Sequence, residues 1–161
     1  MPDKPSYLGL LNAISVAESA AGGIFTEWAD NTTDKRLAKT LRMVAMREAE
    51  HGLAFAKRIM ELGYEVRTPD AEPDPHLGSV ARSKRTDLSK LRALKFNKAP
   101  GGTDVFDGMF GDKTIDPVTG ALLGRYIAEE RDTGRLLKAE HDRLADKDRR
   151  AKERAKSRSA R

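Results

Sequence analysis

The stretch MREAEHGLAF at residues 46–55 places Glu48 and His51 three residues apart in a segment of helical periodicity. Both lie on an apolar stripe, so we expect both to face the protein interior. The apolar members of that stripe are Leu37, Leu41, Val44, Phe55, Ile59 and Leu62. Charged side chains are rarely buried without a partner. The stretch therefore predicts a buried helix on which Glu48 and His51 meet another side chain, a second copy of the chain or a metal ion.

The rest of the chain indicates an all-α fold, an antiparallel helical bundle. Apolar spacing and capping signals predict four helices, at 6–30, 34–62, 86–96 and 117–148. Ser6 is expected to cap the first helix, the turn NTTD to cap the second, and Gly63 to end it. The connections are expected to be a proline-rich segment, 68–78, and a long ordered loop within 97–117.

Composition limits the classes of function. The 161 residues suggest one domain, a bundle over 1–148 followed by a basic flexible tail over 149–161. The chain has no cysteine, which excludes disulfides and thiolate ligands, so any metal must be held by oxygen and imidazole nitrogen. We see neither a signal peptide nor an apolar run long enough to span a bilayer, and expect a cytoplasmic protein without a membrane partner.

The net charge of +5 is concentrated near the C-terminus, where residues 143–161 hold nine Lys/Arg and three Asp/Glu. Residues 82–98 form a second basic segment, with seven Lys/Arg and one Asp. Such segments are usually solvated surface, but they also suit an acidic partner or nucleic acid phosphates. In the C-terminal segment no aromatic residues are interleaved with the charges to stack on bases.

Three acidic residues on different helices are expected at one level of the bundle. Glu18, Glu48 and Glu130 each lie on the apolar stripe near the middle of a helix, and Glu18 and Glu48 are both about 20 Å from the turn that joins their helices. Carboxylates brought together without a counter-charge repel one another and take up protons. The pattern therefore predicts a metal site formed by Glu18, Glu48, His51 and Glu130. The alternative is a set of ion pairs: a buried Glu–His pair or a pair with Arg42 for Glu48 and His51, and a pair with Arg125 or Arg131 for Glu130.

Residues 1–66 resemble the first helical hairpin of the ferritin-like superfamily, which includes rubrerythrins and encapsulated ferritins. The shared features are a helix-borne Glu (Glu18), an acidic turn, Glu-x-x-His (Glu48 and His51) and a closing Leu-Gly. The resemblance implies a di-iron or di-manganese centre that oxidises Fe(II) or reduces peroxide or oxygen.

The second half of the chain departs from that pattern. The third helix offers only Asp87 as a further acidic ligand, and Thr133 follows Glu130 where the family has His. The neighbouring Glu129 and Asp132 are expected to point off the apolar stripe. The site is therefore complete within one chain, shared across a homo-oligomer such as a dimer, mononuclear, or lost. A lost site would leave a non-catalytic adaptor that binds a protein or nucleic-acid partner through its basic tail.

Other polar and aromatic residues have structural interpretations. We expect His141 to be a hydrogen-bonded packing residue, and Trp28 and Tyr126 to lie in the core and at helix seams. Small residues beside the cluster are expected to leave room for ions and water. These are Gly22, Gly52 and Gly134; the turn and capping residues of the long loop are Asp104, Asp107 and Asp112.

Overall fold

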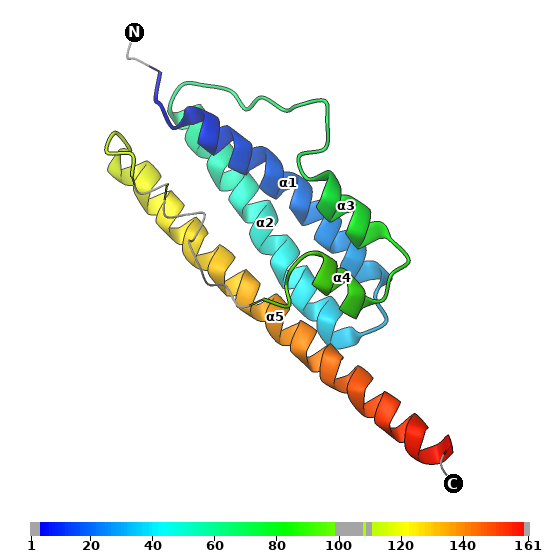
Figure 1. The fold of residues 1–161 in the computed structure, drawn as a ribbon. Helices are drawn as coiled ribbons and strands as arrows, with labels where there is room; N and C mark the ends of the chain where they lie inside the picture. The colour runs from blue at the N-terminus through cyan, green and yellow to red at the C-terminus, as the bar shows by residue number, and fades with distance from the viewer. Residues whose placement is uncertain (1–3, 99–107, 109–110, 160–161) are drawn as a thin grey trace.

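The structure, a computed structural model, describes residues 4–98, 108 and 111–159, and over these residues it contains helices and no strand (Figure 1). The helices are α1 (Leu8–Asn31), α2 (Lys35–Glu61), α3 (Pro75–Arg82), α4 (Asp87–Ala93) and α5 (Pro117–Ser159). The predicted all-α bundle is confirmed. The predictions for Asp104 and Asp107, and for most of the long loop, fall on 99–107 and 109–110, outside the described residues.

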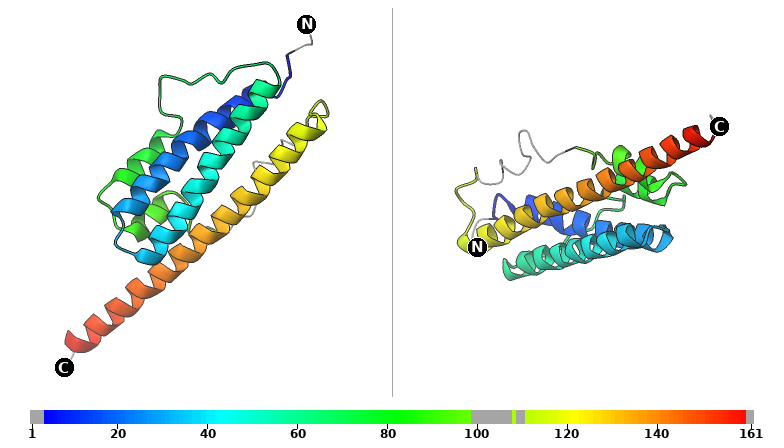
Figure 2. Two further views of the ribbon diagram at one scale, coloured as in Figure 1. Left: turned by 180° about the vertical axis from the view of Figure 1, so that it is seen from behind. Right: turned by 90° about the horizontal axis from the view of Figure 1, so that it is seen from below.

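Three long helices carry the architecture. α1 and α2 form a tightly packed antiparallel hairpin, and α5 runs along it antiparallel to α2 (Figures 1 and 2). α3 packs on α1 and α4 on α5, both near the end of the hairpin that holds the α1–α2 turn. The outer end of α5 projects beyond the other helices.

Local signals explain both ends of α2. The carboxylate of Asp34 accepts a hydrogen bond from the backbone N–H of Leu37 at 2.9 Å, as an N-cap does. Gly63 has a φ of +85°, and Tyr64 N–H donates to the Ile59 carbonyl at 3.1 Å, the bond of a Schellman motif. The prediction for Ser6 is wrong, because its hydroxyl donates to Asp112 and α1 begins without a side-chain cap.

The core has two apolar parts. One lies around Trp28 and Leu41, near the α1–α2 turn; the other lies around Leu11 and Phe55, near the opposite end of the hairpin. The apolar residues of α1, α2 and α5 are interrupted between these two parts. The interruption on each helix holds a buried or half-buried acidic residue, which defines a polar level inside the bundle.

Two elements differ from the sequence-based prediction. α3 lies partly in the segment predicted as a connection, because Asp74 caps Leu77 N–H and Pro75 fits the first turn. Eight residues are too few for apolar periodicity to reveal such a helix. α4 is shorter than predicted mainly because it ends at Ala93: Lys95 has a φ of +64°, and Phe96 N–H donates to the Leu91 carbonyl at 2.9 Å.

α5 continues as a helix to Ser159, beyond residue 148. Ion pairs one turn apart support this extension without apolar contacts, including Lys152 with Asp148 at 2.7 Å. Farther in, the buried carboxylate of Glu140 binds Arg36 at 3.0 Å and Arg143 at 2.6 Å, which ties α5 to the start of α2.

The composition of α1 contradicts the expectation that the chain has no apolar run long enough to span a bilayer. By length and composition alone, Leu8–Asn31 is apolar enough to cross a bilayer, and half of its most apolar stretch is buried inside the protein. The core helix of a bundle meets the same criteria, because one of its faces is covered by neighbouring helices.

Candidate metal centre

The polar level of the bundle brings four potential ligands together. Glu18 comes from α1, Glu48 and His51 from α2, and Glu130 from α5. Each side chain offers one ligand atom, and these atoms all lie within 4.8 Å of one another. Glu18, Glu48 and His51 are buried, and Glu130 is half-buried. The group is able to hold a metal ion.

Three atoms that face one another in this cluster make no hydrogen bond within the described part of the chain: Glu18 Oε2, His51 Nδ1 and Glu130 Oε1. His51 Nδ1 is 3.5 Å from Glu18 Oε2 and 3.6 Å from Glu130 Oε1, which is within ion-pair distance when His51 is protonated but beyond the usual 2.7–3.2 Å of a hydrogen bond. Buried polar atoms without partners are rare and unfavourable. The three atoms therefore surround a position that suits a cation.

The other polar atoms of two of these side chains are held by neighbours. His51 Nε2 lies 2.6 Å from Glu129 Oε2, and the Tyr126 hydroxyl donates to Glu18 Oε1 at 2.9 Å. A carboxylate on one imidazole nitrogen fixes the ring so that the other nitrogen is free for a metal. Arg125 in turn donates to Glu129 at 3.1 Å.

The sequence did not reveal the role of Glu129. Its position lies off the apolar stripe of α5, but it is on the side of the stripe that faces α2, where it reaches His51. The helical wheel of one chain segment does not reveal which edge of a stripe meets a neighbour. Asp132 does stay away from the cluster and pairs with Arg47 at 2.8 Å.

Burial shifts the protonation of the acidic groups. Burial, with Glu18 and Glu130 nearby, raises the pKa of Glu48 to about 11. Burial and the charge of Glu18 raise the pKa of Glu130 to about 7. Without a cation, the cluster therefore holds a proton on Glu48 at neutral pH.

For Glu18 and His51, contacts with neighbouring groups outweigh the effect of burial on the pKa. Burial alone would raise the pKa of Glu18, but contacts with His51, Glu48 and Tyr126 outweigh it and hold that pKa below its usual value. Burial would lower the pKa of His51, but Glu18 and Glu129 outweigh it and raise that pKa. The net effect favours positive charge at the centre of the cluster.

Two arginines that the sequence offers as ion-pair partners for the cluster bind other acidic residues. Arg42 binds Asp30 at 3.1 Å, and Arg125 binds Glu50 and Glu129. Each of these arginines is thus engaged with acidic groups other than the one for which the sequence offered it.

Two of the glycines have a different purpose from the one predicted. A Cβ on Gly52 would lie 2.2 Å from Ser19 Oγ and 2.9 Å from Ser19 N, and one on Gly22 would lie 3.2 Å from the Ala45 carbonyl oxygen. They permit the close approach of α1 and α2 and do not provide space for ions. Gly134 lies instead in the lining of a cavity beside the cluster.

That cavity has a volume of about 430 Å³ and leads to the carboxylates. Its apolar lining includes Phe25, Leu94 and Phe96, and its polar lining includes the three acidic residues of the cluster. A small molecule that entered it would reach the cluster from the side of α4.

Residues predicted to be structural are engaged elsewhere. Trp28 is almost fully buried and donates from Nε1 to Asp87 at 2.8 Å, so Asp87 is held away from the cluster. His141 is buried and lies 2.9 Å from Asp142, as expected for a hydrogen-bonded packing histidine. Tyr126 packs edge-on against His51, with ring centroids 5.0 Å apart.

Searches of protein-family models, curated proteins and solved structures give no match to this chain. Its function is therefore argued from the cluster itself.

Proposed function

We propose that the protein is a ferritin-like di-metal carboxylate protein that binds iron or manganese and oxidises Fe(II) or reduces peroxide or oxygen. One observation carries the proposal: three buried ligand atoms on different side chains face one another without hydrogen bonds. Such an arrangement is unfavourable in a plain scaffold and favourable around a divalent cation.

The donor set fits the proposed metals. Carboxylate oxygens together with one imidazole suit iron and manganese, and no thiolate is available. Glu18, Glu48, Glu130 and His51 Nδ1 would hold the ions. Their three negative charges exceed the charge of one divalent cation by one and fall short of that of two by one, so the charge count is compatible with a single ion or with a pair.

Iron or manganese, when bound, supplies one-electron redox chemistry. Two Fe(II) ions held there would supply, one each, the two electrons that together with two protons convert one peroxide into two waters. Glu129 holds the His51 ring in place, and Tyr126 holds Glu18. The cavity, whose lining includes the exposed residues Asp74, His76 and Lys95, would give a small oxidant a path to the carboxylates.

Metal analysis tests the proposal. Protein purified without a histidine tag and reconstituted anaerobically with Fe(II), or in air with Mn(II), should retain at least one equivalent per chain. Glu18→Gln and Glu130→Gln should each lower that content, whereas the exposed Glu65→Gln should not. Retention far below one equivalent in the parent protein would exclude a metal function.

The reaction has a separate measurement. Fe(II) oxidation by peroxide, followed by ferric absorbance, should be faster with the parent protein than with Glu18→Gln. Tight metal binding without faster oxidation would reject the redox activity while keeping the metal site. Absence of both would favour the adaptor function.

A further inference from the structure

An exposed apolar stripe runs along the outer face of α2. Its large members, Met46, Leu53 and Met60, are 72%, 72% and 67% exposed. They are three of the four large hydrophobic residues that are strongly exposed in the described part of the chain. Single exposed apolar residues are ordinary, but a continuous row is typical of a covered surface.

The spacing of this row matches helix-to-helix packing. The large residues recur every seven positions, and Ala49 and Ala56 lie between them at the intervals of a heptad seam. We call Met46, Ala49, Leu53, Ala56 and Met60 the Leu53 stripe. Alternation of large and small side chains lets a second helix approach closely. The stripe lies on the side of α2 away from the metal ligands.

The charges beside the stripe favour a second copy of the same helix. Glu50 and Lys57 flank it on one side, three residues before and four residues after Leu53; within the chain Glu50 also pairs with Arg125, and Lys57 with Glu61 at 3.5 Å. In an antiparallel pair with a two-fold axis at Leu53, Glu50 would lie opposite the partner's Lys57. A parallel, in-register pair would place Glu50 and the partner's Glu50 on opposite sides of the seam, where neither would meet a lysine of the other chain.

From this self-complementary pattern we propose that two copies of the chain associate through antiparallel packing of their Leu53 stripes. Such an isologous contact is the usual form of a homodimer. The two metal clusters would lie on opposite outer sides of the paired α2 helices, so each chain would keep its own site.

Cysteine cross-linking tests the axis, because the natural chain has no cysteine. Leu53→Cys should give a disulfide-linked dimer, since the two-fold axis brings the two Cβ atoms within bonding range. Met46→Cys alone should not cross-link, but a mixture of Met46→Cys and Met60→Cys chains should. Cross-linking of Met46→Cys with itself would overturn the antiparallel arrangement.

Solution mass tests the association itself. Sedimentation velocity should show a dimer for the parent chain and a monomer for Leu53→Glu, with unchanged helical circular dichroism and metal content. Glu50→Lys should weaken the dimer, and the combined Glu50→Lys, Lys57→Glu exchange should restore it. A monomeric parent, or a Leu53→Glu variant that stays dimeric, would overturn the proposal.

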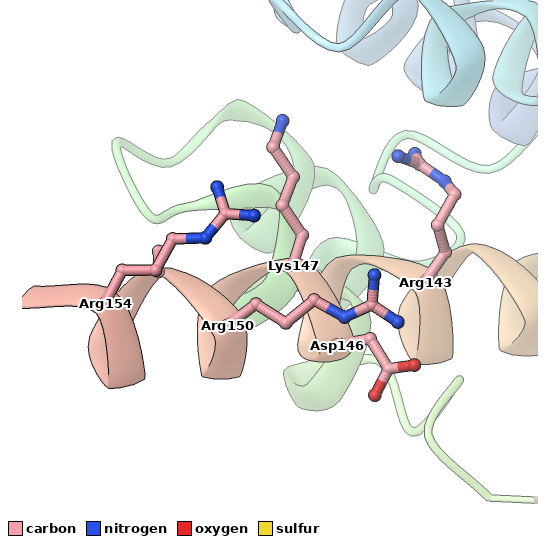
Figure 3. Close-up of a pocket in the computed structure, with 6 residues that line it drawn as sticks. Arg143, Asp146, Lys147, Arg150 and Arg154 are labelled. Atoms are coloured by element: carbon pink, nitrogen blue, oxygen red, sulfur yellow. The ribbon is translucent and has the colours of Figure 1, made fainter. Parts of the chain in front are cut away.

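A second surface, carried by a different observation, lies at the outer end of α5. Five cationic residues share one face of the helix over about 22 Å, and four of them, Arg143, Lys147, Arg150 and Arg154, line a shallow hollow together with Asp146 (Figure 3). We call them the arginine stripe: Arg143, Lys147, Arg150, Arg154 and Arg158. All described side chains from 151 onward are exposed.

The two sides of this helix differ in charge compensation. Away from the stripe, Arg149 pairs with Asp146 at 2.9 Å and Lys152 with Asp148 at 2.7 Å. Among the residues that the structure describes, Arg150, Arg154 and Arg158 have no acidic group within ion-pair distance. The outer stripe therefore presents uncompensated positive charge.

The composition of this segment limits the class of partner that it can bind. After Leu144 the chain has no apolar residue larger than alanine. A membrane-surface helix needs an apolar face, and a protein interface needs buried anchors, so neither fits. Arginine pairs well with phosphate, and a single helix fits the major groove of B-form DNA but not the narrow one of A-form RNA.

We infer that the arginine stripe binds the phosphate backbone of double-stranded DNA without reading its sequence. Its three uncompensated residues, Arg150, Arg154 and Arg158, extend over about 12 Å, or three to four base pairs at about 3.4 Å each, because Arg143 and Lys147 already pair with Asp34. Because the contacts are to phosphates, affinity should fall steeply with salt.

Fluorescence anisotropy with a labelled duplex of arbitrary sequence tests this inference. Replacing Arg150, Arg154 and Arg158 together by Gln should reduce the slope of log K against log salt by about 2.7, or about 0.9 per contact. The matched control replaces Arg149, Lys152 and Lys156, which removes the same charge from the other side.

Equal losses in the two triple variants would show a general charge effect and overturn the stripe as a site. Absence of binding by the parent chain at low salt would overturn it as well. Tighter binding to duplex RNA than to DNA would reject the assignment to the DNA groove.

Discussion

Replacing Glu48 by glutamine should stabilise the metal-free protein while removing its affinity for metal. Burial and the neighbouring acidic residues raise the pKa of Glu48 from 4.5 to about 11, so the folded chain holds this carboxyl protonated at neutral pH. Glutamine has nearly the same shape as a protonated glutamate and carries no charge. It therefore preserves the metal-free packing and removes an anionic ligand.

The magnitude follows from proton linkage. The unfolded chain releases the Glu48 proton above a pKa of 4.5, whereas the folded chain retains it until about pH 11. Folding at about pH 7.5 must therefore rebind a proton about three units above the unfolded pKa, which costs up to about 4 kcal/mol at about 1.4 kcal/mol per unit. The penalty is absent below the unfolded pKa and grows as pH rises, and glutamine removes it.

Urea denaturation of chelator-treated protein at several pH values measures this difference. The free energy of unfolding of Glu48→Gln should exceed that of the parent at neutral pH, and the advantage should vanish toward pH 4.5. Mn(II) should raise the melting temperature of the parent only. The exposed Glu65→Gln is the matched control. A variant less stable than the metal-free parent at neutral pH, or a pH-independent difference, would refute the reasoning.

Three further changes test other parts of the structure. Gly52→Ala should destabilise the hairpin by about 1–3 kcal/mol in urea denaturation, because the new Cβ meets the Ser19 backbone, whereas Gly23→Ala, with open space around it, should stabilise α1 by about 0.5–1 kcal/mol. Glu129→Ala should weaken Mn(II) binding about 10–100-fold by freeing His51, measured by calorimetry; unchanged affinity would contradict its positioning role. Metal affinity should rise with pH, because the carboxyls with raised pKa values must lose protons before they bind a metal. Calorimetry in buffers of different ionisation enthalpy should detect this proton release. Absence of proton release would count against those carboxyls as ligands.

The sequence was informative wherever a helix was long and periodic. The stripe around Glu48 and His51 correctly predicted a buried helix, because more than seven turns of one-sided apolar spacing leave little ambiguity. The same wheel placed Glu18 and Glu130 inward, and the structure brings both to the cluster. Counting residues from the α1–α2 turn was enough to align Glu18 with Glu48.

The contacts between helices could not be predicted in this way. The position of Glu129 against His51 depends on how α5 is rotated about its axis relative to α2, which a single helix does not encode. The close approach at Gly52 depends on the separation of two helices, so Gly52 was wrongly predicted to leave space for ions. The helix α3 was missed because its cap and its proline also indicate a loop.

The contact between Gly52 and Ser19 has a consequence for how this chain can change. Each residue adjoins a proposed ligand, His51 in one helix and Glu18 in the other, so a point where the two backbones touch is one position from the cluster. Sliding one helix past the other by a single turn would separate the glycine from its counterpart and would also misalign the ligands. Mutational drift that preserves a stable hairpin should therefore preserve the spacing of the cluster too, even in a descendant that no longer uses it.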